Sequence, residues 1–263
     1  MTAITSTARP TAHDRPARIA LRLTAVELRL LLREPMVGIG LLGFPLVTML
    51  VIAGVFGQVP DPEFGGVAPD DHYIAGYIGV VLAGLGIVTL PVFAATAREL
   101  GVTRRFRASG VSAGVLVASR ILMGIVVGTA AVAVVLGVGS TVYGMQSPED
   151  LAGVVGWFLA GLLCFIAIGL ALGSIAPTGR SANAVGNLLF VPMFLLGGGG
   201  PPREVMTGPM QAISDVLPLS HVIGGLRMSW LGATDDPQAL WWTMLVTAIA
   251  VALALRSAHR HVG

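Results

Sequence analysis

The stretch ARELGVTRRFRASGVS, residues 97–112, is rich in charge, whereas the chain on both sides of it is almost wholly apolar. Its charged residues are Arg98, Glu99, Arg104, Arg105 and Arg107. The apolar run 74–96 precedes it and the run 115–143 follows it. About 20 apolar residues are long enough to cross a bilayer as a helix. The stretch is therefore predicted to connect two membrane spans.

The composition of the whole chain also indicates a membrane protein. Of its 263 residues only 11% are charged, whereas a soluble domain has about 25%. All 16 basic residues are arginine. A P-loop requires a lysine on the nucleotide phosphates, so this sequence contains no Walker A ATPase. The single Cys164 excludes an internal disulfide.

Six apolar runs are candidates for membrane spans. They lie at residues 36–57, 74–96, 115–143, 151–176, 182–196 and 239–255. Fourteen of the 16 arginines fall in the N-terminal segment, the second and fourth connections with the start of the third run, and the C-terminal tail. Positive charge marks the cytoplasmic side, so both termini are expected in the cytoplasm.

The sequence thus predicts an all-α, multi-pass protein of the cell (plasma) membrane. We divide it into a disordered cytoplasmic tail (1–14), an amphipathic helix (15–34), a six-span domain (35–257) and a second cytoplasmic tail (258–263).

The segment before the first span has its arginines on one face. At 100° per residue, the five arginines fall within about 60° of one another. They are Arg15, Arg18, Arg22, Arg29 and Arg33. Such a helix lies in the membrane interface, with its arginines towards anionic headgroups. Glu27 lies opposite this stripe and is expected to pair with an arginine from elsewhere. The alternative is a basic flank that only orients the first span.

The connection 197–238 begins with GGGGPP, which ends a helix, and continues with short apolar helical turns. These pieces are too short to span a membrane, and we expect extracellular re-entrant or interfacial helices before the last span. The residues that define this element are Pro201, Pro202, Leu217, Pro218, His221 and Arg227. His221 has no further metal ligand close in sequence, and no metal site is expected.

Two further patterns concern the apolar runs themselves. Asn183 and Asn187 are four residues apart and share a helix face, where they line a substrate pathway or make an interhelical hydrogen bond. Phe190 and Phe194 follow in the same run and are candidates for the pathway, with ordinary packing as the alternative. GxxxG pairs at 124–128 and 169–173 permit close helix approach.

Three interpretations of the stretch 97–112 remain open from the residues alone. It enforces topology, it binds phospholipid headgroups, or it is a short helix that docks into a cytosolic partner. In the docking case Phe106 is the buried anchor, arginines surround it, and Gly101 and Gly110 bracket the helix.

The same stretch resembles a motif of type 2 ABC exporter permeases of the drug-resistance branch. Their pattern R-E-x-G-T-x-R-x-L-R-A-T-P-V-S is matched here with departures at Val102, Thr103, Phe106 and Gly110. ELRLLLREP (27–35) is similar to the lead into the first span of that family. DVLPLSHVIGGLR (215–227) resembles the element before its last span. The resemblance covers roughly residues 18–256 and follows the order of the family.

The resemblance implies a transporter subunit rather than an enzyme. It implies a dimer with an identical or related permease, and a separate cytosolic ABC ATPase that carries ATP and Mg²⁺. The expected cargo is a drug, a hydrophobic natural product or a lipid-like molecule, moved outwards by alternating access. Neither a cofactor in this chain nor a nucleic-acid partner is expected, whereas membrane lipid is.

The resemblance also assigns roles to residues. The coupling helix that meets the ATPase is carried by Arg98, Glu99, Gly101, Thr103, Arg104, Arg105, Phe106 and Arg107. The connecting helix that braces it is carried by Arg18, Arg22, Glu27, Arg29 and Arg33. The alternative function is a secondary transporter or channel without ATP coupling. That class usually has an ionisable residue within a span, and the middles of these runs have none.

Overall fold

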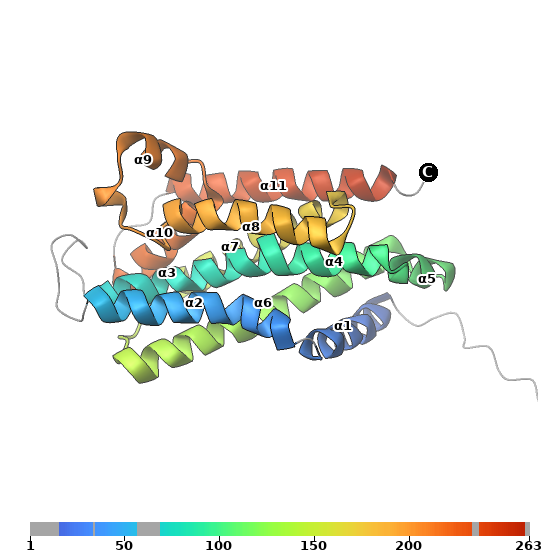
Figure 1. Cartoon of the computed structure of the whole chain (residues 1–263), viewed down its shortest axis with the longest axis horizontal. Helices are drawn as coiled ribbons and strands as arrows, with labels where there is room; N and C mark the ends of the chain where they lie inside the picture. The colour runs from blue at the N-terminus through green and yellow to red at the C-terminus, as the bar shows by residue number, and fades with distance from the viewer. Residues whose placement is uncertain (1–15, 34, 57–68, 233–236, 261–263) are drawn as a thin grey trace, which may run out of the picture.

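The computed structural model describes residues 16–33, 35–56, 69–232 and 237–260, and all regular elements of this part of the chain are helices (Figure 1). The first half contains α1 (Pro16–Leu32), α2 (Pro35–Phe56), α3 (Pro69–Gly84), the π-turn η2 (Leu85–Thr89), α4 (Leu90–Glu99), α5 (Val102–Ala108) and α6 (Ala113–Tyr143). The second half contains α7 (Leu151–Ile175), α8 (Gly179–Leu196), the 3₁₀ turn η3 (Arg203–Val205), α9 (Gly208–Ser214), α10 (Pro218–Leu231) and α11 (Pro237–Arg260).

The long helices run alongside one another and form a bundle with two distinct ends (Figure 1). The α5 end carries α1, α5, the α7–α8 turn and the last turns of α11. The α9 end carries α9, η3 and the first turns of α11 and α3. Trp242 of α11 donates a hydrogen bond to the carbonyl of Val216 at the α9 end (3.1 Å).

All six predicted runs lie in helices, but they are not equally suited to crossing a membrane. Four described segments are long and apolar enough: Asp71–Glu99, Ala113–Tyr143, Leu151–Ile175 and Gln238–Arg256. The apolar part of α2 is shorter, Gly38–Ile52. Polar residues in the first turns of α8, among them Arg180 and Asn183, lower its apolar character. The count of six spans therefore stays a prediction.

Only one of the two predicted tails includes residues that the structure describes. Residues 1–14 lie outside the described residues. α11 continues as a helix to Arg260, so the predicted tail 258–263 begins within this helix, and the boundary at 257 stays a prediction. Nothing in the sequence RSAHR breaks a helix.

The central element is the unbroken helix formed by α3, η2 and α4. It is the most buried of the apolar segments, and side chains such as Ile78, Val81 and Leu85 have almost no exposed area. Pro91 has no N–H to donate to the preceding turn, and the π-turn η2 lies just before it.

Glycines allow α7 and α8 to pack directly on η2. A Cβ added to Gly169 would lie 2.4 Å from the carbonyl oxygen of Gly86, and one added to Gly186 would lie 2.5 Å from that of Ile87. At the GxxxG pair 124–128, an added Cβ would lie 2.9 Å from Ile166 and 2.7 Å from Leu162 of α7. Both predicted pairs therefore form close helix contacts within this chain.

The 197–238 connection contains short helices, as expected. α10 has 14 residues, a length of about 21 Å, which is less than the roughly 30 Å hydrocarbon core. It is buried on most faces, including Pro218, and packs on α3 and α7. Arg227 of α10 donates from Nε to the carbonyl of His72 (2.9 Å) and from Nη2 to that of Gly198 (2.6 Å). Arg227 thereby ties the glycine-rich turn to the start of α3.

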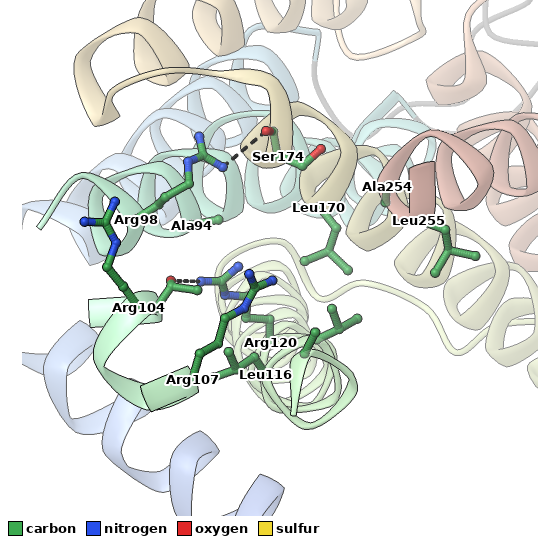
Figure 2. Close-up of a pocket in the computed structure, with 13 residues that line it drawn as sticks. Ala94, Arg98, Arg104, Arg107, Leu116, Arg120, Leu170, Ser174, Ala254 and Leu255 are labelled. Atoms are coloured by element: carbon green, nitrogen blue, oxygen red, sulfur yellow. Dashed lines mark hydrogen bonds between the residues drawn. The ribbon is translucent and has the colours of Figure 1, made fainter. Parts of the chain in front are cut away.

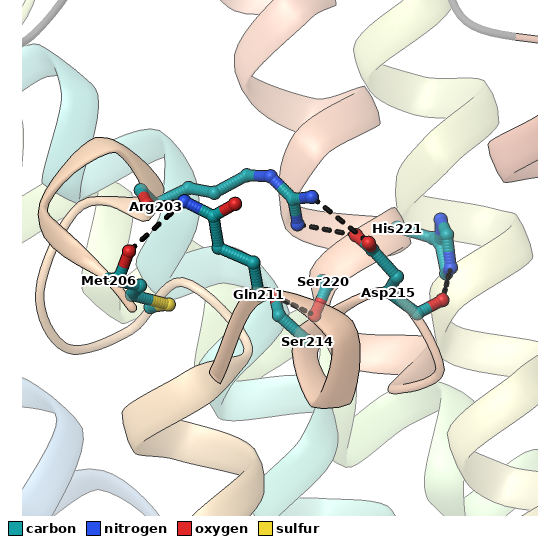
Figure 3. A network of polar contacts seen from close by, with 7 residues as sticks. All are labelled: Arg203, Met206, Gln211, Ser214, Asp215, Ser220 and His221. Atoms are coloured by element: carbon teal, nitrogen blue, oxygen red, sulfur yellow. Dashed lines mark hydrogen bonds and ion pairs between the residues drawn. The ribbon is translucent and has the colours of Figure 1, made fainter. Parts of the chain in front are cut away.

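A polar network holds α9 and η3 together (Figure 3). The guanidinium of Arg203 pairs with both carboxylate oxygens of Asp215, and this hydrogen bonding lowers the pKa of Asp215. Gln211 donates to the carbonyls of Arg203 and Met206. His221 donates through Nε2 to the carbonyl of Asp215 (2.9 Å), which gives it a structural role. Of the other predicted residues, Pro202 is buried, Leu217 is half-buried and Pro201 is exposed.

Candidate functional site

The helix α5 is set off from its neighbours by two glycines in the left-handed conformation. Gly101 has φ 71° and Gly110 has φ 85°, values that favour glycine because other residues have a Cβ. The chain therefore turns sharply before and after the seven residues of α5. The predicted bracketing of this segment by Gly101 and Gly110 is confirmed.

Arg98 and Glu99, at the end of α4, hold the α7–α8 turn. Arg98 donates to the carbonyls of Gly173 (2.8 Å), Ser174 (3.2 Å) and Ala176, which are the unpaired acceptors at the end of α7. A cation is favourable there because the carbonyl end of a helix carries partial negative charge.

Glu99 completes the arrangement at the start of α8. Its carboxylate accepts a hydrogen bond from the N–H of Gly179 (3.0 Å), where a negative charge is favourable for the opposite reason. These contacts join residues 75 to 80 positions apart, and they were not expected from the sequence. Arg98 and Glu99 therefore position α5 on the bundle.

Within α5, Arg104 and Arg105 are exposed, whereas Phe106 and Arg107 are half-buried. Phe106 packs on the cluster of Ala20 and Leu23 from α1 with Val115 and Leu116 from α6. Phe106 thus covers apolar side chains of this chain with part of its ring, and its role as an anchor for a partner stays a prediction. The signal missed was the apolar face of α1, which needs a cover.

The helix α1 has the amphipathic character that its sequence predicts. Arg18, Arg22, Arg29 and Arg33 are all exposed. On the other face, Thr24 is buried and its hydroxyl donates to the carbonyl of Ser119 in α6 (3.2 Å). The placement of α1 in a membrane interface stays a prediction.

Glu27 lies on the packed face of α1, towards α6. Burial raises the pKa of its carboxyl, while the nearby Arg120 and a hydrogen bond from Ser119 act in the opposite direction. The arginine that Glu27 was expected to meet is thus Arg120. This arginine stands two turns inside an otherwise apolar run, and that position was the available signal for it.

A cavity of about 420 Å³ opens between α4, α5, α6, α7 and α11 at the α5 end (Figure 2). Its basic lining residues are Arg98, Arg104, Arg107 and Arg120. Arg120 donates through Nη2 to the hydroxyl of Thr103 (3.4 Å), which joins α6 to α5. The structure thus gathers Thr103 and three of the arginines predicted for coupling around one space.

Comparison with protein families assigns the chain as a whole. A family model described as ABC-2 type transporter matches residues 20–231, which extends from α1 to the end of α10. The chain belongs to the ABC-2 type transporter family. It is a permease component rather than an enzyme. A comparison with curated proteins finds no match.

The residues predicted to line the pathway of this ABC-2 permease separate into two pairs. Asn183 and Asn187 are exposed, and the Asn187 amide donates to the Asn183 side chain (2.9 Å). Phe190 and Phe194 are buried, and their rings meet the ring of Phe44 at 5.8 and 5.0 Å. All four were candidates for the pathway, and the structure places the asparagines and the phenylalanines on different sides of α8.

The two pairs separate because the row of α8 residues that contacts neighbouring helices is inclined to the axis of α8. The buried row consists of Ala182, Gly186, Phe190 and Phe194, spaced by four. Rows with this spacing are inclined to the helix axis, as in helices that cross at an angle. The asparagines follow the first two members of the row by one residue, a rotation of about 100°. They are thereby turned outwards.

No group of three or more His, Cys, Asp or Glu side chains within the described part of the permease is arranged to hold a metal ion.

Proposed function

We propose that the chain is the membrane-spanning subunit of an ATP-driven exporter, and that a separate cytosolic ATPase docks on α5. The observation that carries the proposal is the state of α5 itself. It presents Arg104 and Arg105 on the outside, while its remaining contacts join it to α1, α4 and α6.

The attachments of α5 suit it to transmit movement. It continues from α4 through Gly101 and contacts α1 and α6 through Phe106. The preceding residues, Arg98 and Glu99, form hydrogen bonds with the end of α7 and the start of α8. A displacement of α5 would therefore be transmitted to several long helices at once. A helix that only marked topology would not need these contacts.

The energy source must lie in another chain, since this sequence lacks the lysine of a P-loop. ABC-2 permeases generally pair with an ATPase and form dimers. We therefore assign ATP and Mg²⁺ to the partner ATPase, and a second permease, identical or related, to the dimer.

The distribution of charge supports a cytoplasmic α5 end. All the arginines of α1, α4, α5 and α6 belong to this end, whereas Glu149, Asp150 and Asp215 belong to the other. Under the positive-inside rule both termini are then cytoplasmic, in a plasma membrane. The helices α9 and α10 become the extracellular cap.

For the substrate we retain a drug, a hydrophobic natural product or a lipid-like molecule. Asn183 and Asn187 present polar groups on a face of α8 that otherwise exposes Leu188, Val191 and Leu195. In a dimer this face is available to the second copy or to cargo. Outward transport follows from the resemblance to drug-resistance exporters.

The test is co-purification of the tagged chain with cytosolic ATPases co-expressed from the same genome. We expect one ATPase to bind the wild type, and the double variant Arg104→Glu/Arg105→Glu to lose it. The matched control is Arg29→Glu/Arg33→Glu, which makes the same charge change on α1 at the same end. If no ATPase binds the wild type with or without nucleotide, or if both variants lose it equally, docking on α5 is wrong.

A further inference from the structure

The cavity at the α5 end has a chemistry that ATPase docking does not explain. It lies between the helices, and α5 forms one wall of it. In Figure 2 the side chains of Arg98, Arg104, Arg107 and Arg120 occupy one side, and Leu170, Ala254 and Leu255 occupy the other. The space therefore has a cationic half and an aliphatic half.

The lining of the cationic half is basic. Among the described residues that line the cavity, none is acidic. Glu27 approaches Arg120 from α1, and the carboxylate of Glu99 accepts from Gly179 at the start of α8. Neither of these two carboxylates lines the cavity: Glu27 lies beside Arg120 on the side of α1, and Glu99 is bonded to α8.

Arg120 is the most deeply placed of the four. Its Nη2 reaches Thr103, but its Nε is buried and has no hydrogen-bond partner within the described residues. A buried donor without a partner is costly, because it has lost its hydrogen bond to water. A ligand that accepts hydrogen bonds from this guanidinium would remove that cost.

Guanidinium groups bind phosphate oxygens through paired, charge-assisted hydrogen bonds. Basic pockets between membrane helices on the cytoplasmic side are suited to lipid headgroups. The volume of about 420 Å³ lies within the range of small-ligand sites. The aliphatic half, with Leu170, Ala254 and Leu255, has no function for a free inorganic ion, but it suits the first carbons of an acyl chain.

We propose that this cavity binds the phosphate group of an anionic phospholipid, with the arginines on the headgroup and the aliphatic wall beside the chains. The shared chemistry is a phosphate anion, and the apolar wall favours the lipid over free phosphate as its source. Because α5 closes one side of the cavity, the bound lipid braces α5 against α6 and α7. The proposal requires the chain to lie in a membrane, but it does not depend on ATPase coupling.

The experiment measures lipid binding by the purified full chain without any ATPase. Native mass spectrometry, with titration of phosphatidylglycerol, phosphatidylcholine or inorganic phosphate, reports occupancy and affinity. We expect saturable binding of phosphatidylglycerol, at least tenfold tighter than phosphatidylcholine. The Arg104→Ala/Arg107→Ala variant should lose at least tenfold in affinity for phosphatidylglycerol. The control Arg29→Ala/Arg33→Ala, with the same charge change outside the cavity, should stay within twofold of wild type.

A second variant separates the headgroup from the acyl chain. Leu170→Phe keeps all four arginines but fills part of the aliphatic half. This variant should weaken the binding of phosphatidylglycerol and leave the binding of inorganic phosphate unchanged. Inorganic phosphate binding as tightly as the lipid would overturn the lipid as the source.

Two results would overturn the site itself. One is equal binding of phosphatidylglycerol and phosphatidylcholine. The other is an equal loss in the α1 control, which would mean a general attraction of the basic surface for anionic lipid.

Discussion

The contact between α7 and the central helix gives the sharpest test of the fold. Replacing Gly169 by alanine places a Cβ 2.4 Å from the carbonyl oxygen of Gly86 and 3.0 Å from the Cβ of Leu90. Ordinary contacts begin near 3.4 Å, so the two helices must separate by about 1 Å. The obstructing atom is backbone, and no change of rotamer removes the clash. Overpacking of this kind costs about 2–3 kcal/mol.

The single cysteine supplies the assay. Cys164 lies in α7 with 0% of its surface exposed, and it reacts with a thiol-specific fluorescent dye only when the protein unfolds. For a chain of this size, 1 kcal/mol corresponds to about 2–4 °C, so Gly169→Ala should lower the unfolding midpoint by roughly 4–12 °C.

Gly156 on the same helix is the matched control. An added Cβ there meets nothing within 4 Å, and alanine is the better helix former. Gly156→Ala should therefore leave the midpoint unchanged or raise it slightly. A midpoint for Gly169→Ala equal to that of the wild type would show that α7 does not approach η2 as closely as described.

Three further predictions use the unfolding midpoint, followed by the dye at pH 7 and by tryptophan fluorescence at lower pH, where too little thiolate is present for the dye to react. Arg98→Ala should lower the midpoint, because the carbonyls at the end of α7 lose charge-assisted hydrogen bonds of about 1.5–3 kcal/mol. Arg98→Lys should restore only part of the loss, because one ammonium group cannot reach three carbonyls. A midpoint for Arg98→Ala equal to that of the wild type would refute the stabilising role of these hydrogen bonds. The pKa of Glu27 in the folded state lies above its usual 4.5. The wild type should therefore gain stability relative to Glu27→Gln as the pH falls through that raised pKa towards 4.5. Unfolding midpoints of the two proteins that change in parallel with pH would contradict this. Asp215→Asn should cost no more than about 0.2–1 kcal/mol at pH 7, since its pair with Arg203 is roughly half exposed, and the difference should vanish as the pH falls below 3.8; a large effect independent of salt would be inconsistent with this pair.

The sequence was sufficient where one helix decides its own structure. The 3.6-residue period gave the exposed arginines of α1, and apolar length gave the long helices. Gly101 and Gly110 were recognisable because a turn next to a short helix needs a residue that tolerates positive φ.

The sequence was insufficient where a residue is decided by a distant segment. Arg98 has three acceptors about 75 residues away, and no local pattern points to them. Phe106 packs on α1, a segment far from it in the sequence, and no local pattern indicates this contact. The split between Asn187 and Phe190 depends on the angle at which α8 crosses its neighbours, which a helical wheel does not contain.

The continuous helix of α3, η2 and α4 also has a mechanical consequence. It has a length of about 46 Å, and its tightest contacts, at Gly86 and Ile87, lie nearer the α5 end. If it turns as a rigid lever about that pivot, the arm towards α5 is about 19 Å and the arm towards the other end, where Arg227 binds, is about 26 Å. A displacement of α5 by about 2 Å would then move the far end by about 3 Å in the opposite direction. A movement that brings the helices together at the α5 end of the bundle would separate them at the α9 end. Distances between spin labels on neighbouring helices would then change with opposite sign at the two ends.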